Sequence, residues 1–273
     1  MLCPQTLPSW RAGSAARPSQ HTQAAAPLAR SRAALRCRVV GGEVMREVLS
    51  RSERSKVDSS DDRLFYGAPR FTQHVDDGFL AQLTELYRRL LPAGGAVLDV
   101  GASHISHLPE EVEYSTVAGM GLNAEELSRN RRLNTFVVRN LNEEPRGWPH
   151  GDQTFDAVVC CVSIQYFQRP EEVMAEIYRV LKPGGVLVIS FSNRMFGTKA
   201  IAAWRDGTGY SRSQLVKQYI AAVAGFTLPT VLTEVLTTPD LSPLGRLKSL
   251  FARSSSDPFY AVVAYRNFKR EDH

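Results

Sequence analysis

The stretch VLDVGAS at residues 97–103 combines the residue types that could hold a cofactor. An apolar run there contains Asp99, ends at Gly101 and precedes a segment that could begin a helix. In Rossmann-like domains this combination opens the cofactor pocket, because glycine lets the backbone approach the ligand closely. A glycine-rich loop would have two more glycines where Ser103 and Ile105 stand. The stretch therefore predicts a nucleotide-type cofactor fold with an altered loop.

Acid–base candidates gather in YGAPRFTQHVDD, residues 66–77, just before a predicted helix. His74 could accept a proton from a hydroxyl group, because imidazole titrates near neutral pH. Tyr66 and Arg70 could also contact a substrate. The alternative is that all three are polar surface residues and that Asp77 caps the following helix. Both interpretations stay open at this point.

His104 and His107 have the i, i+3 spacing of a possible metal pair. No nearby set of carboxylates or cysteines completes such a site, so we interpret them as loop histidines. Cys160 and Cys161 are adjacent in an apolar run, which favours two small core residues. We therefore expect no metal.

The rest of the chain alternates between helix-like and strand-like patterns. Predicted helices cover residues 79–91, 125–130, 171–181, 199–204 and 211–223, with Asn123 as a candidate N-cap. Predicted strands cover residues 96–100, 115–120, 135–138, 155–162, 186–190, 231–236 and 259–265. A tight turn at Pro183–Gly185 is expected to lead into the fifth strand. This alternation specifies an α/β fold with a doubly wound, mostly parallel sheet.

Charge separates the beginning of the chain from the rest. The net charge is +5, but residues 1–42 hold six arginines and no acidic residue, which leaves 27 basic and 28 acidic residues elsewhere. The balance does not imply a nucleic-acid-binding face, and no apolar run is long enough for a membrane span. Residues 1–42 lack the apolar core of a secretory signal, so we predict an organelle transit peptide. Import machinery is the implied partner; chloroplast is favoured over mitochondrion, since the segment is rich in Ser, Gln and Pro.

Three motifs carry a resemblance to a known family. VLDVG, then TFDAVVC, then RVLKPGGVLVIS resemble a class I S-adenosylmethionine-dependent methyltransferase, and more narrowly the type 11 methyltransferase domain. Segments near residues 106–109, 121–123 and 192–195 are also similar to a methyltransferase-like subgroup of plants and algae. The resemblance implies a Rossmann-like seven-stranded sheet with helices on both faces and an antiparallel last strand. It implies a methyltransferase-like domain at 79–268, preceded by an N-terminal cap segment at 43–78.

The resemblance also implies roles for individual residues. The loop after the first strand would hold the methionine part of the cofactor, with Gly101 close to it and Ser103 as a hydrogen-bond donor. Gly121 stands where relatives usually have an acidic residue for the ribose, and Asn123 could bond a ribose hydroxyl instead. The predicted cofactor-binding residues are Asp99, Gly101, Ser103, Gly121, Asn123, Asn140, Leu141 and Ser163. The predicted catalytic residues are His74 and Tyr166.

The function implied is transfer of a methyl group from S-adenosylmethionine to a small organic acceptor. An Asn-Pro-Pro-Tyr type motif is absent after the fourth strand, which argues against methylation of DNA adenine. The alternative is a catalytically inactive methyltransferase-like binding or assembly protein in the plastid, because Ser103, Ile105 and Gly121 depart from the motif. A dinucleotide-dependent enzyme is a third hypothesis, which the incomplete glycine pattern disfavours.

Overall fold

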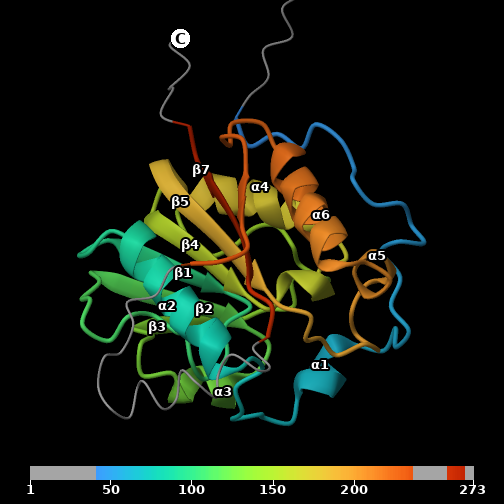
Figure 1. The fold of residues 1–273 in the computed structure, drawn as a ribbon, viewed down its shortest axis with the longest axis horizontal. Helices are drawn as coiled ribbons and strands as arrows, with labels where there is room; N and C mark the ends of the chain where they lie inside the picture. Colours follow the sequence, from blue (N-terminus) through green and yellow to red (C-terminus); the bar gives the residue numbers. More distant parts are fainter. Residues whose placement is uncertain (1–40, 236–256, 268–273) are drawn as a thin grey trace, which may run out of the picture. The chain divides into compact units, whose positions relative to one another are not determined.

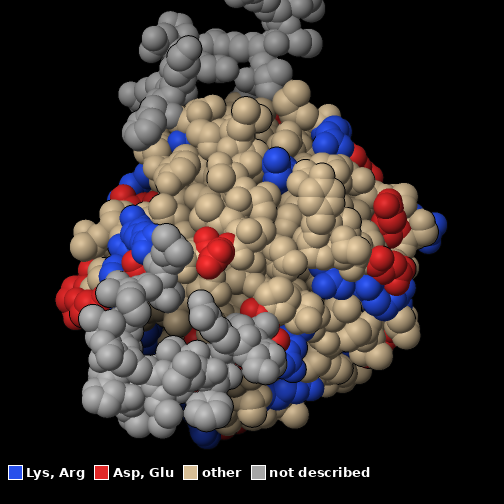
Figure 2. Space-filling view, in the orientation of Figure 1, with Lys and Arg blue, Asp and Glu red and all other residues tan. Residues whose placement is uncertain are grey.

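The computed structural model describes residues 41–235 and 257–267 (Figure 1). The transit peptide predicted at 1–42 therefore lies almost entirely outside the described residues. In the described part, no helix has both the length and the apolar character needed to cross a bilayer. Figure 2 shows basic and acidic side chains interspersed on the uncovered part of one face, rather than gathered in one large basic patch.

The described strands form one sheet at the centre of the fold. They are β1 (Ala96–Val100), β2 (Thr116–Gly121), β3 (Thr135–Val138), β4 (Phe155–Cys161), β5 (Leu181–Phe191), β6 (Thr230–Leu232) and β7 (Tyr260–Tyr265). Their order is β3-β2-β1-β4-β5-β7-β6, and only β7 runs antiparallel to its neighbours (Figure 1). The predicted seven-stranded, mostly parallel sheet with an antiparallel last strand is confirmed.

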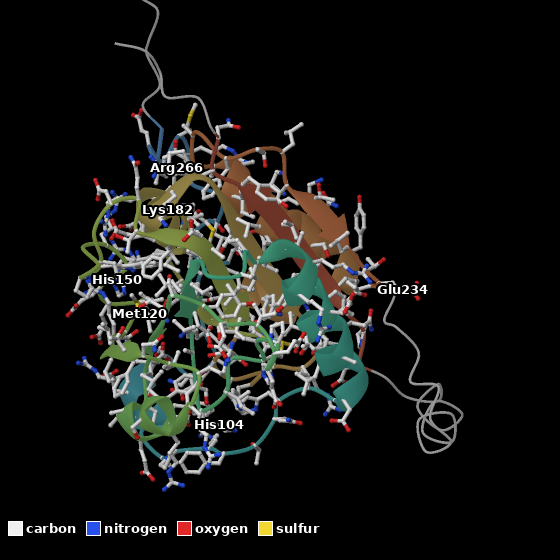
Figure 3. All side chains as sticks on the ribbon, turned by 90° about the vertical axis from the view of Figure 1, so that its left-hand side faces the viewer. His104, Met120, His150, Lys182, Glu234 and Arg266 are labelled. Carbon is white, nitrogen blue, oxygen red and sulfur yellow. The ribbon has the colours of Figure 1, made fainter. Side chains whose placement is uncertain are left out.

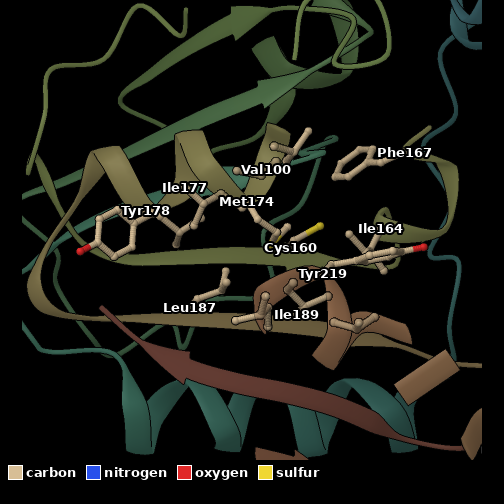
Figure 4. Packing of buried hydrophobic residues seen from close by; sticks show 14 of the residues in the cluster. Val100, Cys160, Ile164, Phe167, Met174, Ile177, Tyr178, Leu187, Ile189 and Tyr219 are labelled. Atoms are coloured by element: carbon tan, nitrogen blue, oxygen red, sulfur yellow. The ribbon is translucent and has the colours of Figure 1, made fainter. Parts of the chain in front are cut away.

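Helices cover both faces of this sheet, as predicted. The helices are α1 (Asp62–Tyr66), α2 (Asp77–Leu90), α3 (Ala124–Arg129), α4 (Pro170–Val180), α5 (Ala202–Arg205) and α6 (Gly209–Ala221). Side chains alternate along each strand, so Val97 packs in the core under α2, whereas Leu98 packs in the core under α4 and α6. Figure 4 shows Met174 and Ile177 of α4 beside Leu187 of β5.

The beginning of β5 differs from the predicted tight turn. Residues 181–191 belong to one strand, in which Leu181 pairs with Phe155 and Val186 pairs with Ala157. Residues between these two pairs bulge out of the ladder, and Gly184 has a φ of +79°. The proline–glycine segment thus interrupts a strand rather than preceding one, because ladder partners exist on both sides of it.

The segment before α1 is held against the helix face by one buried ion pair. The Glu171 carboxylate, in the first turn of α4, accepts hydrogen bonds from the Val48 amide and from both terminal nitrogens of Arg54. Burial by itself raises the pKa of Glu171, but these bonds outweigh it and the pKa is lowered. A β-bridge between Lys56 and Ile201 continues the contact. The segment then passes into α1 near the carboxyl ends of the strands.

Replacing Glu171 tests this attachment. Glu171→Gln removes the charge that faces Arg54, so we expect a loss of about 1.5–3 kcal/mol in the free energy of unfolding, measured with urea. Glu172→Gln is the matched control, because Glu172 pairs with the exposed side chains of Arg146 and Arg169 and should cost less than about 1 kcal/mol. Equal losses in the two variants would contradict the assignment.

Candidate functional site

A cavity of about 320 Å³ lies at the carboxyl ends of β1, β2 and β4. This is the point where the strand order reverses, which is where ligands bind in open α/β sheets. All ten residues predicted from the sequence line the cavity, although they come from five separate segments. They are His74, Asp99, Gly101, Ser103, Gly121, Asn123, Asn140, Leu141, Ser163 and Tyr166. The structure thus brings the whole set together; the role of each residue stays a prediction.

The end of β1 supplies a buried acid and a glycine that no other residue can replace. Asp99 is 4% exposed, and burial raises its pKa to about 7 against the opposing hydrogen bond from Ser106. Gly101 has a φ of +77°, and a Cβ there would collide with the side chain of Ser163. The Ser163 hydroxyl donates to the Gly101 carbonyl at 3.1 Å. The loops after β1 and β4 therefore touch directly.

Position 121, at the end of β2, also requires glycine, because a side chain there would collide with a neighbouring loop. A Cβ at this position would overlap the carbonyl oxygen of Ala102. The Gly101 and Ala102 amides both donate to the Met120 carbonyl, at 2.8 and 2.9 Å, and this draws the β1 loop onto β2. An acidic side chain at 121 would have to displace that loop. The backbone path of the β1 loop therefore explains why position 121 has no acidic residue to bind a ribose.

The side-chain amide of Asn123 makes four hydrogen bonds within the protein. Its Oδ1 accepts from the amides of Glu125 and Glu126, so it caps α3 as predicted. Its Nδ2 donates to the carbonyls of Tyr66 and Gly67 at 2.8 and 3.0 Å. Two donors and two acceptor sites are then all occupied. A bond from this side chain to a ribose hydroxyl stays a prediction, and it would have to replace or share one of these four hydrogen bonds.

Ser103 also has a protein partner. Its hydroxyl donates to Glu126 Oε2 at 2.6 Å, so its only proton is not available to a ligand. Ile105, which stands where a glycine-rich loop would have a glycine, lines the cavity and is 41% exposed. Glu126 lines the cavity and also accepts from the Arg70 amide at 2.7 Å. The sequence did not indicate a role for Glu126, because acidic residues are common in the first turn of a helix and Glu125 stands beside it.

The β3–β4 side of the cavity is formed by Asn140 and Leu141, both buried. Asn140 Oδ1 accepts from the Asn142 amide at 3.0 Å. Its Nδ2 makes no hydrogen bond to the described residues, which leaves that donor for a ligand. Leu141 joins the hydrophobic core and presents an apolar surface. An amide donor beside an apolar side chain suits a flat heteroaromatic ring such as adenine.

The remaining wall is aromatic and comes from the N-terminal segment and the β4 and β5 loops. The rings of Tyr66, Tyr166 and Phe196 lie within 6.2 Å of one another, and the Arg70 guanidinium lies 5.4 Å from the Phe196 ring. The Tyr166 hydroxyl accepts from the Phe196 amide at 2.9 Å. Burial raises the pKa of Tyr166, so this hydroxyl keeps its proton at neutral pH. Tyr166 can donate a hydrogen bond but is a poor base.

His74 lies beside this wall, with its ring 5.5 Å from that of Phe196. Partial burial lowers the pKa of His74, against the opposing field of Glu126. The imidazole is therefore neutral around pH 7, which is the form a general base needs. The structure keeps His74 as a candidate base at the mouth of the cavity.

A buried ion cluster beneath α1 was not predicted from the sequence. Lys199 is fully buried, and its Nζ lies 3.3 Å from Asp62 Oδ1 and 3.1 Å from Asp58 Oδ2. Lys56 binds the other oxygen of Asp62 at 2.6 Å. Asp62 lines the cavity, so the cluster anchors the N-terminal segment beside the site. Sequence spacing gives no signal for it, since Lys199 is more than 130 residues from its partners.

Among the described residues, no three His, Cys, Asp or Glu side chains are arranged to hold a metal ion. His104 and His107 line the cavity as loop residues. Burial lowers the pKa of His107 to about 4, so it is neutral at physiological pH.

Comparison with known proteins agrees with this geometry. Residues 98–189, from β1 to β5, match the family model described as a methyltransferase domain. The matched stretch is about a third of the chain.

Two curated methyltransferases are similar to less than half of this chain. The chain is 34% identical over 131 residues to sterol 24-C-methyltransferase of Schizosaccharomyces pombe, covering 45% of this chain and 33% of that protein. It is 30% identical over 113 residues to a ubiquinone/menaquinone biosynthesis C-methyltransferase of Haemophilus ducreyi, covering 40% and 43%. The match thus spans less than half of each of these two relatives. A solved S-adenosylmethionine-dependent methyltransferase of Mesorhizobium loti has a TM-score of 0.44 at 17% identity, covering 67% and 96%.

The raised pKa of Asp99 predicts a specific dependence of stability on pH. The folded protein holds a proton on Asp99 up to pH about 7, whereas the unfolded chain loses it near 3.8. The contribution of Asp99 to stability is therefore complete below pH 3.8 and is lost as pH rises to about 7. Asp99→Asn should gain stability relative to the wild type across this window, by at most about 4 kcal/mol. Urea unfolding at several pH values measures it, and a constant difference would contradict the assignment.

The contact at Gly121 predicts that a larger residue cannot be introduced there. Gly121→Ala should lower the free energy of unfolding by about 1–3 kcal/mol, because the new methyl group presses on the Ala102 carbonyl. Gly197→Ala is the matched control, since a Cβ at Gly197 meets nothing within 4 Å. Thermal unfolding monitored by circular dichroism would compare them. A Gly121→Ala variant as stable as the control would show that the loop is not held on β2.

Proposed function

We propose that the protein binds S-adenosylmethionine in the cavity and transfers its methyl group to a small organic acceptor. The observation that carries this proposal is the convergence of Asp99, Gly101 and Ser163 on one cavity at the switch point of a methyltransferase-type sheet. The relatives named above act, by their names, on a sterol and on quinone precursors, which supports a small acceptor with carbon skeletons of this kind. The acceptor itself is part of the proposal.

The residues present fit the cofactor at three of its four parts. Asp99 offers a carboxyl for the ammonium group: burial raises its pKa to about 7, and a neighbouring positive charge would lower the pKa and favour the carboxylate. The Gly101 backbone leaves room for the methionine chain, and Asn140 with Leu141 suits the adenine. The ribose lacks its usual acid because Gly121 must stay a glycine. When bound, S-adenosylmethionine supplies an activated methyl group on a positively charged sulfur.

The chain's own residues would act mainly by placement. Holding the acceptor in line with the sulfonium can supply about 7–11 kcal/mol of the barrier. The aromatic wall of Tyr66, Tyr166 and Phe196 presents flat apolar surface to an acceptor and excludes water. Tyr166 can orient an acceptor oxygen by donating its proton, and neutral His74 can take a proton from an acceptor hydroxyl.

Calorimetry with S-adenosylmethionine tests the proposal. We expect saturable binding to the wild type and its loss in Gly101→Leu, because the new side chain meets Ser163 and the φ is +77°. Gly94→Ala is the matched control. Gly94 has a φ of +73°, so this variant has the same backbone strain as Gly101→Leu, but its new Cβ meets nothing within 4 Å. Circular dichroism would verify that both variants fold. The absence of wild-type binding at millimolar cofactor would refute the proposal.

A second candidate is a methyltransferase-like protein that binds without catalysis. Two observations favour it: no acid can stand at 121, and the Ser103 proton is used by Glu126. Methyl transfer in an extract that depends on this chain would decide against it.

The leader motivates a proposal on location. We propose that residues 1–42 direct the chain to the plastid through the import machinery, and that it belongs to the methyltransferase-like subgroup of plants and algae. The arginine-rich, acid-free composition of residues 1–42 supports the location, and the segments near residues 106–109, 121–123 and 192–195 support the subgroup. The N-terminal segment 43–78 would then act as the cap of the mature domain, since its residues 66–75 contribute to the cavity wall.

A further inference from the structure

Three neighbouring polar groups line the cavity and share hydrogen bonds in a fixed direction. Ser103 Oγ lies 2.6 Å from Glu126 Oε2 and 3.1 Å from His104 Nδ1. A carboxylate only accepts hydrogen bonds, so the single proton of the Ser103 hydroxyl points to Glu126. The contact with His104 then requires the imidazole to donate from Nδ1. In the neutral ring, Nε2 is consequently left with a free lone pair.

We propose that His104 is the proton acceptor of this cavity, with Ser103 and Glu126 as positioning residues that set its tautomer. The proposal rests on the proposed methyl transfer and deepens it by naming a base for an acceptor that carries an acidic O–H or N–H. It also gives Ser103 a purpose: a glycine there could not link the imidazole to the carboxylate. Figure 3 labels His104 in the loop beyond β1.

The hydrogen-bond relay of Glu126, Ser103 and His104 is held in place at both ends. Glu126 belongs to α3 and uses its other oxygen to accept from the Arg70 amide at 2.7 Å, so the carboxylate cannot turn away without losing a bond. The His104 ring is held edge-on to Phe71 with centroids 5.6 Å apart. Among the described residues no hydrogen bond fixes the ring of His74. His104 is therefore the better oriented of the two imidazoles.

The proton transfer balances without another reagent. The acceptor's O–H or N–H proton moves to Nε2 of His104, while the acceptor's lone pair forms the new bond to the methyl carbon. The carbon–sulfur bond breaks and its electron pair returns to sulfur, which becomes a neutral thioether. The imidazolium then lies one hydroxyl away from the Glu126 carboxylate.

The charged and titratable groups near His104 are one carboxylate, two other imidazoles and two guanidinium groups. Glu126 is the anion, and the Ser103 hydroxyl joins it to the ring. His74 and His107 are the neighbouring imidazoles, and His104 lowers the pKa of each, so protonation of one disfavours another. The Arg129 guanidinium lies over the Phe71 ring, 4.1 Å from its centroid, and the Arg70 amide donates to Glu126. Because His107 has a pKa of about 4, it does not compete for the proton at pH 7.

Histidine-ring NMR of the full chain tests the tautomer without any substrate. With ¹⁵N-labelled histidine, we expect the His104 signal, assigned by its loss in His104→Gln, to show protonated Nδ1 and unprotonated Nε2 near pH 7.5. Ser103→Ala and Glu126→Gln should shift this ring toward the Nε2–H form. Ser128→Ala is the control, because that hydroxyl bonds only its own helix on the exposed side. A wild-type Nε2–H tautomer, or one unchanged in Ser103→Ala, would overturn the proposal.

Kinetics separate this inference from the proposed function. Calorimetry should show that His104→Gln binds S-adenosylmethionine within about twofold of the wild type, while kcat for methyl transfer falls at least tenfold. Glu126→Gln should lower kcat with a changed pH profile. If the wild type itself does not bind the cofactor, the proposed function fails and the NMR result still decides the relay. If His104→Gln transfers methyl groups at the wild-type rate, the base assignment is wrong.

Discussion

The loop after β1 lies so close to β2 and β4 that only glycine can occupy positions 101 and 121. At Gly101 the limits are a positive φ and the side chain of Ser163; at Gly121 the limit is the carbonyl oxygen of Ala102. Two hydrogen bonds to the Met120 carbonyl hold the loop in this place. Because this loop lines the cavity, the positions of the side chains that it carries depend on this backbone contact. Asp99, Ser103 and His104 all take their positions from it.

The departures from the usual methyltransferase pattern are physically coupled. A loop that packs on β2 leaves no room for an acid at 121, and the carboxylate nearest to the cavity there is Glu126 on α3. Glu126 accepts from Ser103 and from the backbone of the N-terminal segment, so it joins the floor of the cavity to its cover. Ser103 and Gly121 are thus parts of one rearranged wall. A rearranged site explains these residues at least as well as decay of an active one.

Secondary structure and topology were largely predictable because they depend on local signals. The apolar runs at 96–100 and 155–161 are buried on both faces, and Asn123 caps α3 through bonds to residues two and three positions on. The roles of single side chains were less predictable. Asn123 and Ser103 are polar residues in the expected places, but their hydrogen bonds go to Tyr66, Gly67 and Glu126. Such partners come from distant segments, and no spacing rule connects them.

The amino-acid sequence by itself determined the order of strands and helices, the class of fold and the set of residues that would meet at the carboxyl ends of the strands. It could do so because side-chain period, capping and turn residues act over a few positions, and because parallel strands bring their ends to one edge. Tertiary structure alone decided which of these groups remain free. The proton of Ser103 goes to Glu126, the amide of Asn123 holds residues 66–67, and the buried pair of Lys199 and Asp62 fixes the N-terminal segment. Hydrogen-bonding capacity is limited, and only the folded chain shows where it is used.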